Sequence, residues 1–497
     1  MTFPDPVAHR ARTEPDRPAV ESSRERLTYG ELDRRARAVA WRLAGLGVGE
    51  GSRVALLLHN GTPFVVLLHA LARLGAVCVP LHVRLAPPEL RWRLEDCQPA
   101  LLVTEPQLQD RARQAGWSTV ACVDPEHPDL LPESRPERVR LRAAFSLHRV
   151  QGILYTSATT GEPKGAQLTF GNHLWNALAS NLHLGCDPEG AWLAVLPLAH
   201  VGGAAILWRA ALCGGRVVLH ERFDPEAFHR EVDRGIAYTS VVPTMLQRVL
   251  EVRAEGRVPA TLQAVLVGGG PVPPELVQEA AQRGWPVAPT YGLTEAASQV
   301  TTLHPRLAKT RPDCAGRPLF PVSVRAGRSA EEAEEIRVKG PTVMKGYFRR
   351  PKASAEVLRG GWLHTGDVGY VDPEGYLHVL DRRVDLVVTG GENVYPAEVE
   401  AVLRRHPAVA EAAVVGVPDP RWGQQVVAFV RPAPGALVDP QDLVAFCRGR
   451  LAGFKVPRRV WLVEDFPRTG LDKVSRRSLR EEALRRLAEE KAGVDPW

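Results

Sequence analysis

A run of hydroxyl residues, glycines and one lysine between Tyr155 and Gly165 is the stretch of this 497-residue chain whose residue types best suit an anion. It reads Tyr-Thr-Ser-Ala-Thr-Thr-Gly-Glu-Pro-Lys-Gly and follows the apolar pair Ile153-Leu154, which predicts the end of a strand. A helix is expected to begin near Thr169. Small residues let backbone N–H groups approach an anion, hydroxyls donate hydrogen bonds, and a lysine supplies a compact charge. The composition therefore favours phosphate, although a polar surface turn has a similar composition.

The spacing within this run separates it from the common P-loop. Lys164 precedes its glycine and no Ser or Thr follows it, so the pattern G-x-x-x-x-G-K-[ST] is absent and a P-loop ATPase is disfavoured. The run instead resembles the phosphate loop of adenylate-forming enzymes, the superfamily of acyl-CoA synthetases and luciferases. Ala158 stands where that loop usually has glycine, and alanine adopts positive φ poorly. The resemblance implies that the ATP phosphates contact Thr156, Ser157, Thr159, Thr160, Gly161 and Lys164.

Two later motifs extend the nucleotide site. Three glycines, Gly268, Gly269 and Gly270, follow an apolar run, and Tyr291-Gly-Leu-Thr-Glu295 follows the next one. Glycines let a flat group lie against exposed backbone, although a tight turn explains them equally well. A tyrosine can stack on a base, and a carboxylate suits Mg²⁺, which takes oxygen ligands. In the superfamily the glycines and Tyr291 contact adenine, Thr294 contacts the α-phosphate and Glu295 binds the magnesium ion.

For three single residues, only the resemblance to the adenylate-forming enzymes suggests a role in binding substrates. His200 follows a proline turn and precedes two glycines, and taken alone it reads as a core histidine before a helix. The superfamily has at this position a histidine or aromatic residue that walls the acyl pocket and affects access of pantetheine. Asp367 and Arg382 would otherwise be a loop carboxylate and guanidinium. In the superfamily, the aspartate and arginine at the positions of Asp367 and Arg382 contact the ribose of the nucleotide.

The last third of the chain carries the remaining motifs. Gly390 and Gly391 match the glycines that line the pantetheine tunnel, and Lys473 matches the lysine that bridges the acyl carboxylate and the α-phosphate. Two positions depart from the pattern. Val384 stands at the interdomain hinge, where the superfamily commonly has Asp or Lys, and Asp472 replaces a glycine beside Lys473.

Apolar runs alternate with amphipathic stretches through most of the chain. Runs such as 54–58, 76–79 and 264–267 predict strands buried on both faces. Such alternation predicts parallel sheets with helices outside and sites at the carboxyl ends of strands. We expect an α/β protein with a large N-terminal domain, residues 1–383, built of two doubly wound sheets and a small β unit at about 305–383. A smaller, mobile α+β domain, residues 384–497, is expected to follow a hinge near 384.

Composition limits the kinds of binding partner that are expected for this protein. Hydrophobic residues make up 44% and charged residues 24% of the chain, as in globular proteins. The net charge of +6 is spread along helices without interleaved aromatics, so anionic small molecules explain it and nucleic acid is disfavoured. No apolar run is long enough for a transmembrane helix, and the N-terminus does not resemble a secretory signal. The seven scattered cysteines indicate neither a disulfide framework nor a zinc site, so a cytoplasmic location is expected.

The resemblance implies a two-step reaction with ATP, Mg²⁺ and CoA, in which a carboxylic acid becomes an acyl-adenylate and then a thioester. Three stretches, 267–273, 289–302 and 315–321, resemble one branch, the o-succinylbenzoate–CoA ligases of menaquinone biosynthesis. Arg209, Ser298 and Thr302 are the candidates for holding that acid, with solvent exposure the equal alternative for Arg209.

Other functions stay open at this point. Another aryl- or fatty-acyl-CoA ligase is the main alternative. A non-catalytic nucleotide-binding regulator would be expected to have lost Lys473 or Glu295, and both are present. A nonribosomal peptide module would need a downstream carrier domain. Sequence leaves a homodimer neither indicated nor excluded.

Overall fold

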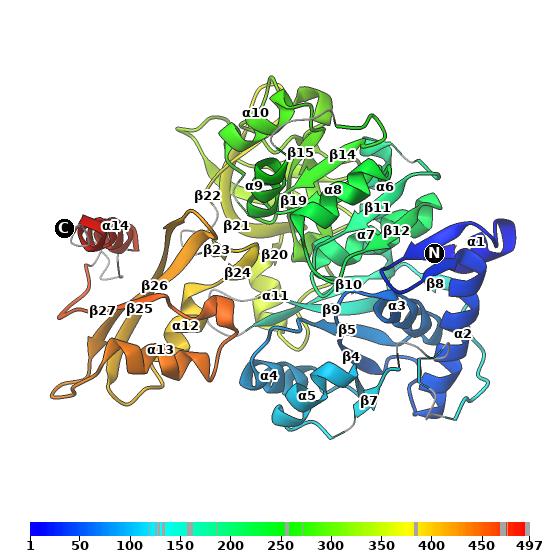
Figure 1. Ribbon diagram of the computed structural model, residues 1–497, viewed down its shortest axis with the longest axis horizontal. Coiled ribbons are helices and arrows are strands. Elements are labelled where there is room, and N and C mark those ends of the chain that lie inside the picture. Colours follow the sequence, from blue (N-terminus) through cyan, green and yellow to red (C-terminus); the bar gives the residue numbers. More distant parts are fainter. Residues whose placement is uncertain are drawn as a thin grey trace. The chain divides into compact units, whose positions relative to one another are not determined.

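The computed structural model describes residues 1–118, 120–124, 127, 130–131, 135–156, 163–185, 187–253, 258–270, 272–381, 386–467, 474 and 476–492. The chain forms two compact units (Figure 1). The first comprises Met1–Val83, Leu90–Tyr155 and Gly165–Leu380. The second comprises Asp381–Trp497 together with two short segments from earlier in the chain, Arg84–Glu89 and Thr156–Lys164.

The largest sheet of the first unit has the strand order β17-β16-β15-β14-β13-β11-β12-β2-β3. Its central strands are parallel, and antiparallel pairs lie at both ends, β15–β16–β17 at one and β2–β3 at the other. The strands are β2 (Pro18–Glu21), β3 (Arg26–Thr28), β11 (Ala191–Ala194), β12 (Arg216–Leu219), β13 (Tyr238–Val241), β14 (Ala264–Val267), β15 (Val287–Leu293), β16 (Ser298–Thr302) and β17 (Arg317–Pro318).

The second large sheet has the order β10-β9-β5-β4-β6-β7, and its strands from β9 to β7 are parallel. The strands are β4 (Arg53–Leu57), β5 (Val77–Leu81), β6 (Leu101–Thr104), β7 (Val120–Cys122), β9 (Val150–Thr156) and β10 (Lys164–Thr169). A two-stranded pair joins β1 (Thr2–Pro4) to β8 (Ala144–Ser146).

Helices cover both faces of the largest sheet. On one face lie α8 (Pro225–Asp233), α9 (Pro243–Val252) and α10 (Pro274–Gln282) (Figure 1). Their apolar side chains form a core with alternate strand residues. On the other face, α2 (Tyr29–Gly45), α3 (Thr62–Leu74) and α7 (Val201–Cys213) build a core shared with the six-stranded sheet. The remaining helices before residue 300 are α1 (Pro6–Thr13), α4 (Pro87–Cys97), α5 (Gln109–Gln114), α6 (Phe170–Leu184) and the short turns η1 (Pro106–Leu108) and η2 (Thr294–Ala296).

An antiparallel sheet completes the first unit, as the short strand-like pieces after residue 305 predict. Its order is β18-β19-β21-β20, and β22 also pairs with β21. The elements are η3 (Pro305–Leu307), β18 (Ser323–Arg325), β19 (Glu334–Lys339), α11 (Pro351–Val357), β20 (Leu358–Arg359), β21 (Trp362–Val371) and β22 (Leu377–Asp381).

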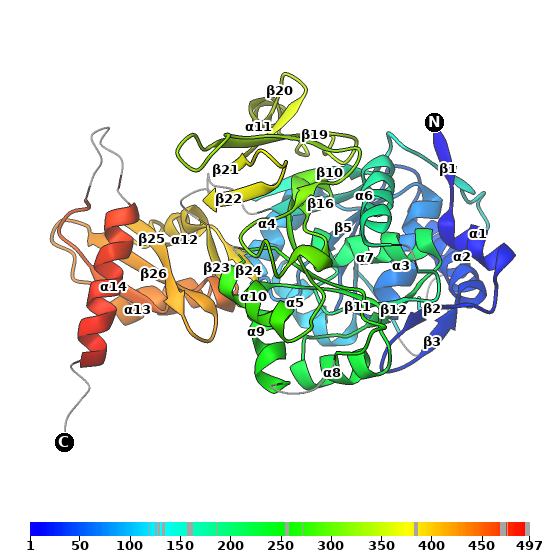
Figure 2. The same ribbon diagram turned by 90° about the horizontal axis from the view of Figure 1, so that it is seen from above.

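The second unit is a mixed sheet with helices on both faces. The strand order is β24-β23-β26-β25, with β27 parallel to β26. Apolar residues of α12 and α13 pack on one face and those of α14 on the other, which Figure 2 shows as a single helix crossing β25 and β26. The elements are β23 (Val387–Thr389), β24 (Glu392–Val394), α12 (Pro396–Leu403), β25 (Val409–Asp419), β26 (Gly423–Pro432), α13 (Pro440–Arg448), η4 (Gly453–Lys455), β27 (Arg459–Leu462) and α14 (Arg476–Ala492).

The sequence predicts the α/β fold class correctly, and local signals explain much of it. Thr28 caps α2 through a capping box in which its hydroxyl and the Glu31 carboxylate each accept a backbone N–H. One element was missed. The helix expected near Thr169 is α6, which Thr169 caps and which begins at Phe170, but strand β10 between the phosphate loop and that helix was not expected. Among the described residues no helix combines the length and apolarity needed to cross a membrane.

Candidate active site

The glycine run after β14 brings two strands of the large sheet close together. Gly268 is buried, and a Cβ on it would lie 2.7 Å from the Thr290 carbonyl oxygen in β15. Gly269 has a φ of +78°, in the region that favours glycine. The run therefore needs glycine at these two positions, and it leaves Gly269 exposed at the carboxyl end of the strand, where parallel sheets form their sites.

Tyr291 and Asp367 meet, although 76 positions separate them in the chain. The Tyr291 hydroxyl in β15 donates a hydrogen bond of 2.7 Å to the Asp367 carboxylate in β21. The Tyr291 side chain is buried, and Asp367 follows Gly366, whose φ is +76°. The structure thus brings together the residues expected to contact adenine and ribose.

Glu295 lies in the short turn η2 beside Thr294, and both are half-buried. The Tyr347 hydroxyl donates to Glu295 Oε1 at 2.8 Å, and the backbone N–H of Met344 donates to the Glu295 carbonyl at 2.8 Å. The two bonds fix both ends of the glutamate, so its carboxylate is oriented before any cation binds. Tyr347 was not predicted, because nothing near it in sequence marks it as a partner.

The chain leaves this turn through two residues with unusual backbone angles. Ala297 and Ser298 have φ values of +57° and +107°, which non-glycine residues rarely adopt. The β15–β16 hairpin holds them there, and Gly292 opposite has no room for a side chain because a Cβ would lie 2.0 Å from the Ser298 carbonyl oxygen. Backbone strain of this kind clusters at functional sites.

Arg209 in α7 does not face solvent; its side chain is only 1% exposed. Its Nη2 donates to Ser298 Oγ and to Asn176 Oδ1, both at 3.3 Å, and the guanidinium lies 5.5 Å from the centre of the Trp192 ring. Among the described residues its Nε has no hydrogen-bond partner. Burial lowers the pKa of Arg209 to about 9, so it still carries its charge at neutral pH.

Arg209 and Ser298, two of the three candidates for holding the acid, are in contact in the structure, whereas the third, Thr302, has other partners. The Thr302 hydroxyl donates to the Thr301 carbonyl at 2.8 Å and accepts from the Gln299 amide at 2.8 Å. Thr290 Oγ1 also lies 3.0 Å from this hydroxyl. Asn176, which does contact Arg209, was missed; a buried polar residue on the apolar helix α6 was the signal that could have found it.

His200 is exposed at the N-terminal end of α7, and its ring centroid lies 5.2 Å from that of His82. Asn60 holds the loop that leads to it. The Asn60 amide donates to the carbonyls of Leu196 at 2.9 Å and His220 at 3.2 Å, and its oxygen accepts the Leu198 N–H at 2.8 Å. Asn60 therefore joins the carboxyl ends of β4, β11 and β12. The His-Asn-Gly turn after β4 was the available clue to it.

Of the phosphate loop, the structure describes only its two ends. Thr156 ends β9 and its hydroxyl donates to the Lys164 carbonyl at 3.3 Å, at the start of β10. Ser157, Thr159, Thr160 and Gly161 lie outside the described residues, as do Arg382, Val384 and Lys473.

In the second unit, Gly390 and Gly391 form the two-residue turn between β23 and β24. Their φ values are +58° and +83°, and two positive values are what the tight type I′ hairpin turn requires. The Gly390 N–H donates to the Trp422 carbonyl at 2.8 Å, and a Cβ on Gly390 would lie 2.9 Å from the Trp422 ring. The two glycines are thus needed by the turn itself.

Comparison with known proteins places these residues in a family. The model of the AMP-binding enzyme family matches residues 7–348, and that of the AMP-binding enzyme C-terminal domain matches residues 398–473. The chain is 44% identical over 486 residues to the 2-succinylbenzoate–CoA ligase of Geobacillus kaustophilus, covering 96% of this chain and 98% of the relative. It is 40% identical to the enzyme of that name from Bacillus cereus, with 97% and 98% covered.

Solved structures agree with the sequence relatives. A double mutant of the o-succinylbenzoate CoA synthetase of Bacillus subtilis, bound with the product analogue OSB-NCoA, is 37% identical with a TM-score of 0.90, covering 97% of this chain and 99% of that one. An amide bond synthetase from Marinactinospora thermotolerans is 32% identical with a TM-score of 0.85, covering 96% and 99%. With its glycine run, its Tyr291–Asp367 pair and both family domains in order, the chain belongs to the AMP-binding enzyme family.

Proposed function

We propose that this protein is an AMP-forming acid–CoA ligase that converts 2-succinylbenzoate, ATP and CoA into 2-succinylbenzoyl-CoA, AMP and diphosphate. In the first step a carboxylate oxygen of the acid attacks the α-phosphorus of ATP and displaces diphosphate. In the second step the CoA sulfur attacks the acyl carbonyl carbon, AMP leaves, and the thiol proton is released. The proposal includes a cytoplasmic location, where ATP and CoA are available.

The nucleotide half of the site suits adenosine. The ring of Tyr291 is assigned to adenine, the glycine run leaves the Gly269 backbone exposed, and the Asp367 carboxylate can accept hydrogen bonds from the ribose hydroxyls, whereas Arg382 would donate to a ribose oxygen. Thr294 follows on the same segment and would reach the α-phosphate. Glu295, oriented by Tyr347, provides the carboxylate oxygen that Mg²⁺ prefers, and that ion would neutralise phosphate charge when bound.

Charge neutralisation and alignment account for the adenylation step, because the reaction needs no protein nucleophile. Lys164 and Lys473 are proposed to carry positive charge to the phosphates and the reacting carboxylate. For the thioester step, we assign His200 to the wall of the acyl pocket and Gly390 and Gly391 to the path of pantetheine. The hinge near residue 384 would let the second unit change place between the two steps.

The observation that carries the choice of acid is the buried guanidinium of Arg209. 2-Succinylbenzoate has two carboxylates, only one of which is activated, and the other would be costly to bury without a partner. Arg209 and the Ser298 hydroxyl lie 3.3 Å apart and can both donate to a carboxylate, directly or through water. A fatty acid has no group that needs such a cation. Burying an arginine for an apolar substrate would be costly.

The variant Arg209→Ala tests this assignment when its KM is measured for 2-succinylbenzoate and for ATP. Loss of a charge-assisted hydrogen bond weakens binding by roughly 1.5–3 kcal/mol, which is on the order of ten- to a hundredfold in the KM for 2-succinylbenzoate. The KM for ATP should stay within about a factor of two. Arg230→Ala, on the exposed side of α8, is the matched control. An unchanged KM for the acid in Arg209→Ala would exclude the assigned role.

A further inference from the structure

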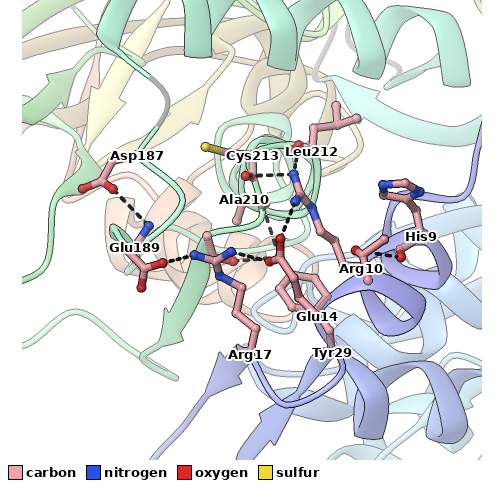
Figure 3. A network of polar contacts seen from close by, with 12 residues as sticks. His9, Arg10, Glu14, Arg17, Tyr29, Asp187, Glu189, Ala210, Leu212 and Cys213 are labelled. Carbon is pink, nitrogen blue, oxygen red and sulfur yellow. Dashed lines mark hydrogen bonds and ion pairs between the residues drawn. The ribbon is translucent and has the colours of Figure 1, made fainter.

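The C-terminal turn of helix α7 is held by residues from the first 30 positions of the chain (Figure 3). Arg10 in α1 donates from Nη2 to the carbonyls of Leu212 at 3.2 Å and Cys213 at 3.1 Å. These carbonyls belong to the last turn of a helix, which has no intrahelical donors for them and carries partial negative charge. Arg10 therefore supplies both the missing donors and a favourable charge.

Tyr29, the first residue of α2, makes a second attachment at the C-terminal end of α7, to residues on both sides of the last turn. Its hydroxyl donates to the Gly215 carbonyl at 2.8 Å and lies 3.3 Å from the carbonyl oxygen of Ala210, the residue next to Arg209. Tyr29 is 2% exposed, and burial raises its pKa, so the hydroxyl keeps its proton and remains a donor. The Asn181 amide in α6 donates to the Arg209 carbonyl itself at 3.1 Å.

The Arg10 side chain is closely packed and has little room to move. A Cβ on Gly214, whose φ is +88°, would lie 2.8 Å from the Arg10 guanidinium carbon, so the arginine packs directly on the backbone after α7. Figure 3 shows the chain of contacts that continues from Arg10 through Glu14 and Arg17 to Glu189. The hydrogen bond from Arg17 lowers the pKa of Glu14, which keeps Glu14 ionised at neutral pH.

We propose that Tyr29 and Arg10 are positioning residues for recognition of the acid, acting through Arg209; this rests on the proposed function. They fix the turn of α7 from which the Arg209 side chain extends to Asn176 and Ser298. Both of those hydrogen bonds are 3.3 Å long, near the upper limit for such a bond, so a small shift of the helix end would break them. The nucleotide residues described above lie on other elements, and binding of ATP should not depend on this attachment.

Tyr29→Phe is the sharpest single change, because it removes only the hydroxyl and keeps the buried ring. We expect the KM for 2-succinylbenzoate to rise about three- to tenfold, the effect of one hydrogen bond, with the KM for ATP within about twofold of wild type. Arg10→Met should act in the same direction. Arg12→Met, an exposed position on the same helix, is the control and should leave both KM values unchanged.

A double-mutant cycle separates positioning from a general effect on folding. If Tyr29 acts through Arg209, adding Tyr29→Phe to Arg209→Met should change the KM for the acid no further. A full additional rise in that background, an equal rise in the KM for ATP, or an unchanged acid KM in Tyr29→Phe alone would overturn the inference. A wild-type enzyme that does not use 2-succinylbenzoate would overturn the proposed function and this inference together. Normal use of the acid with an unaffected Tyr29→Phe would overturn the inference alone.

Discussion

The hydroxyl of Tyr291 donates a 2.7 Å hydrogen bond to the carboxylate of Asp367. This bond joins the largest sheet to the antiparallel sheet of the same unit, through strands β15 and β21. It also fixes the orientation of the carboxylate that we assign to the ribose. In the proposed site Tyr291 would therefore have two roles: its ring is assigned to the base, and its hydroxyl holds the carboxylate that is assigned to the sugar.

Tyr291→Phe should separate these roles. The ring stays and the hydrogen bond is lost, so the KM for ATP should rise about three- to tenfold while the KM for the acid is unchanged. Discrimination between ATP and its 3′-deoxy analogue should also fall, because Asp367 is no longer held in place. Tyr238→Phe, which removes a hydroxyl bonded to the Gly185 carbonyl at 2.9 Å, is the control. Full retention of ribose discrimination in Tyr291→Phe would argue against the positioning of Asp367 by Tyr291.

The two half-reactions should separate at Lys473. We expect Lys473→Ala to abolish acyl-adenylate formation, because it removes the charge proposed to bridge the carboxylate and the α-phosphate. The same variant should still convert supplied acyl-adenylate and CoA into thioester. Diphosphate release measures the first step, and mass spectrometry of the thioester measures the second. If both steps fail equally, Lys473 does not have a role specific to adenylation.

The stability of the first unit should fall in mild acid. His69 and His173 are fully buried, and desolvation lowers the pKa of each to about 4. Unfolded histidine titrates near 6.5, so between pH 6.5 and 4 the unfolded chain binds protons that the folded chain does not, and stability decreases as pH falls. Each histidine should contribute a loss of about 2 kcal/mol between pH 7 and 5.

Urea unfolding of His173→Phe at the two pH values measures this contribution. The substitution keeps an aromatic ring stacked on Trp208, at a centroid distance of 5.4 Å in the wild type, and removes the titrating group. The loss of stability on acidification should shrink by about 2 kcal/mol relative to wild type. His148→Gln, at an exposed position, should behave as wild type. An undiminished acid sensitivity in His173→Phe would mean that His173 does not titrate as its burial implies.

Sequence was most informative where a local pattern has a local consequence. The capping box at Thr28 starts α2, and the apolar runs become strands buried on both faces. Strand β10 was missed because it begins within the phosphate loop, where Lys164 and Gly165 give only a weak local signal for a strand, and its pairing with β9 overrides that signal. The residues that orient the site were missed for a related reason. Tyr347, Asn176 and Asn60 contact partners far away in the chain, and only the fold brings them together.

The Arg209–Ser298 contact was predicted only in part: the two residues were named from the sequence, but their contact was not. Each residue was singled out because it could serve an anionic substrate, and exposure of Arg209 was an equal alternative. The fold decided it by burying Arg209 among Trp192, Asn176 and Ser298. Thr302 was chosen on the same argument, but its side chain bonds with Gln299 and the Thr301 carbonyl. Ser298 and Thr302 stand four positions apart on β16, whose register with β15 shifts between them, and sequence alone does not give that shift.

We propose that this site forms a CoA thioester from a dicarboxylic aromatic acid. The most direct measurement is the kcat/KM of CoA-dependent AMP release with 2-succinylbenzoate, benzoate and a medium-chain fatty acid, in the wild type and in Arg209→Ala. We predict that 2-succinylbenzoate is the best substrate by at least about tenfold, and that Arg209→Ala removes most of that preference. A fatty acid or benzoate that the wild type uses better than 2-succinylbenzoate would contradict the assignment of this acid as the substrate.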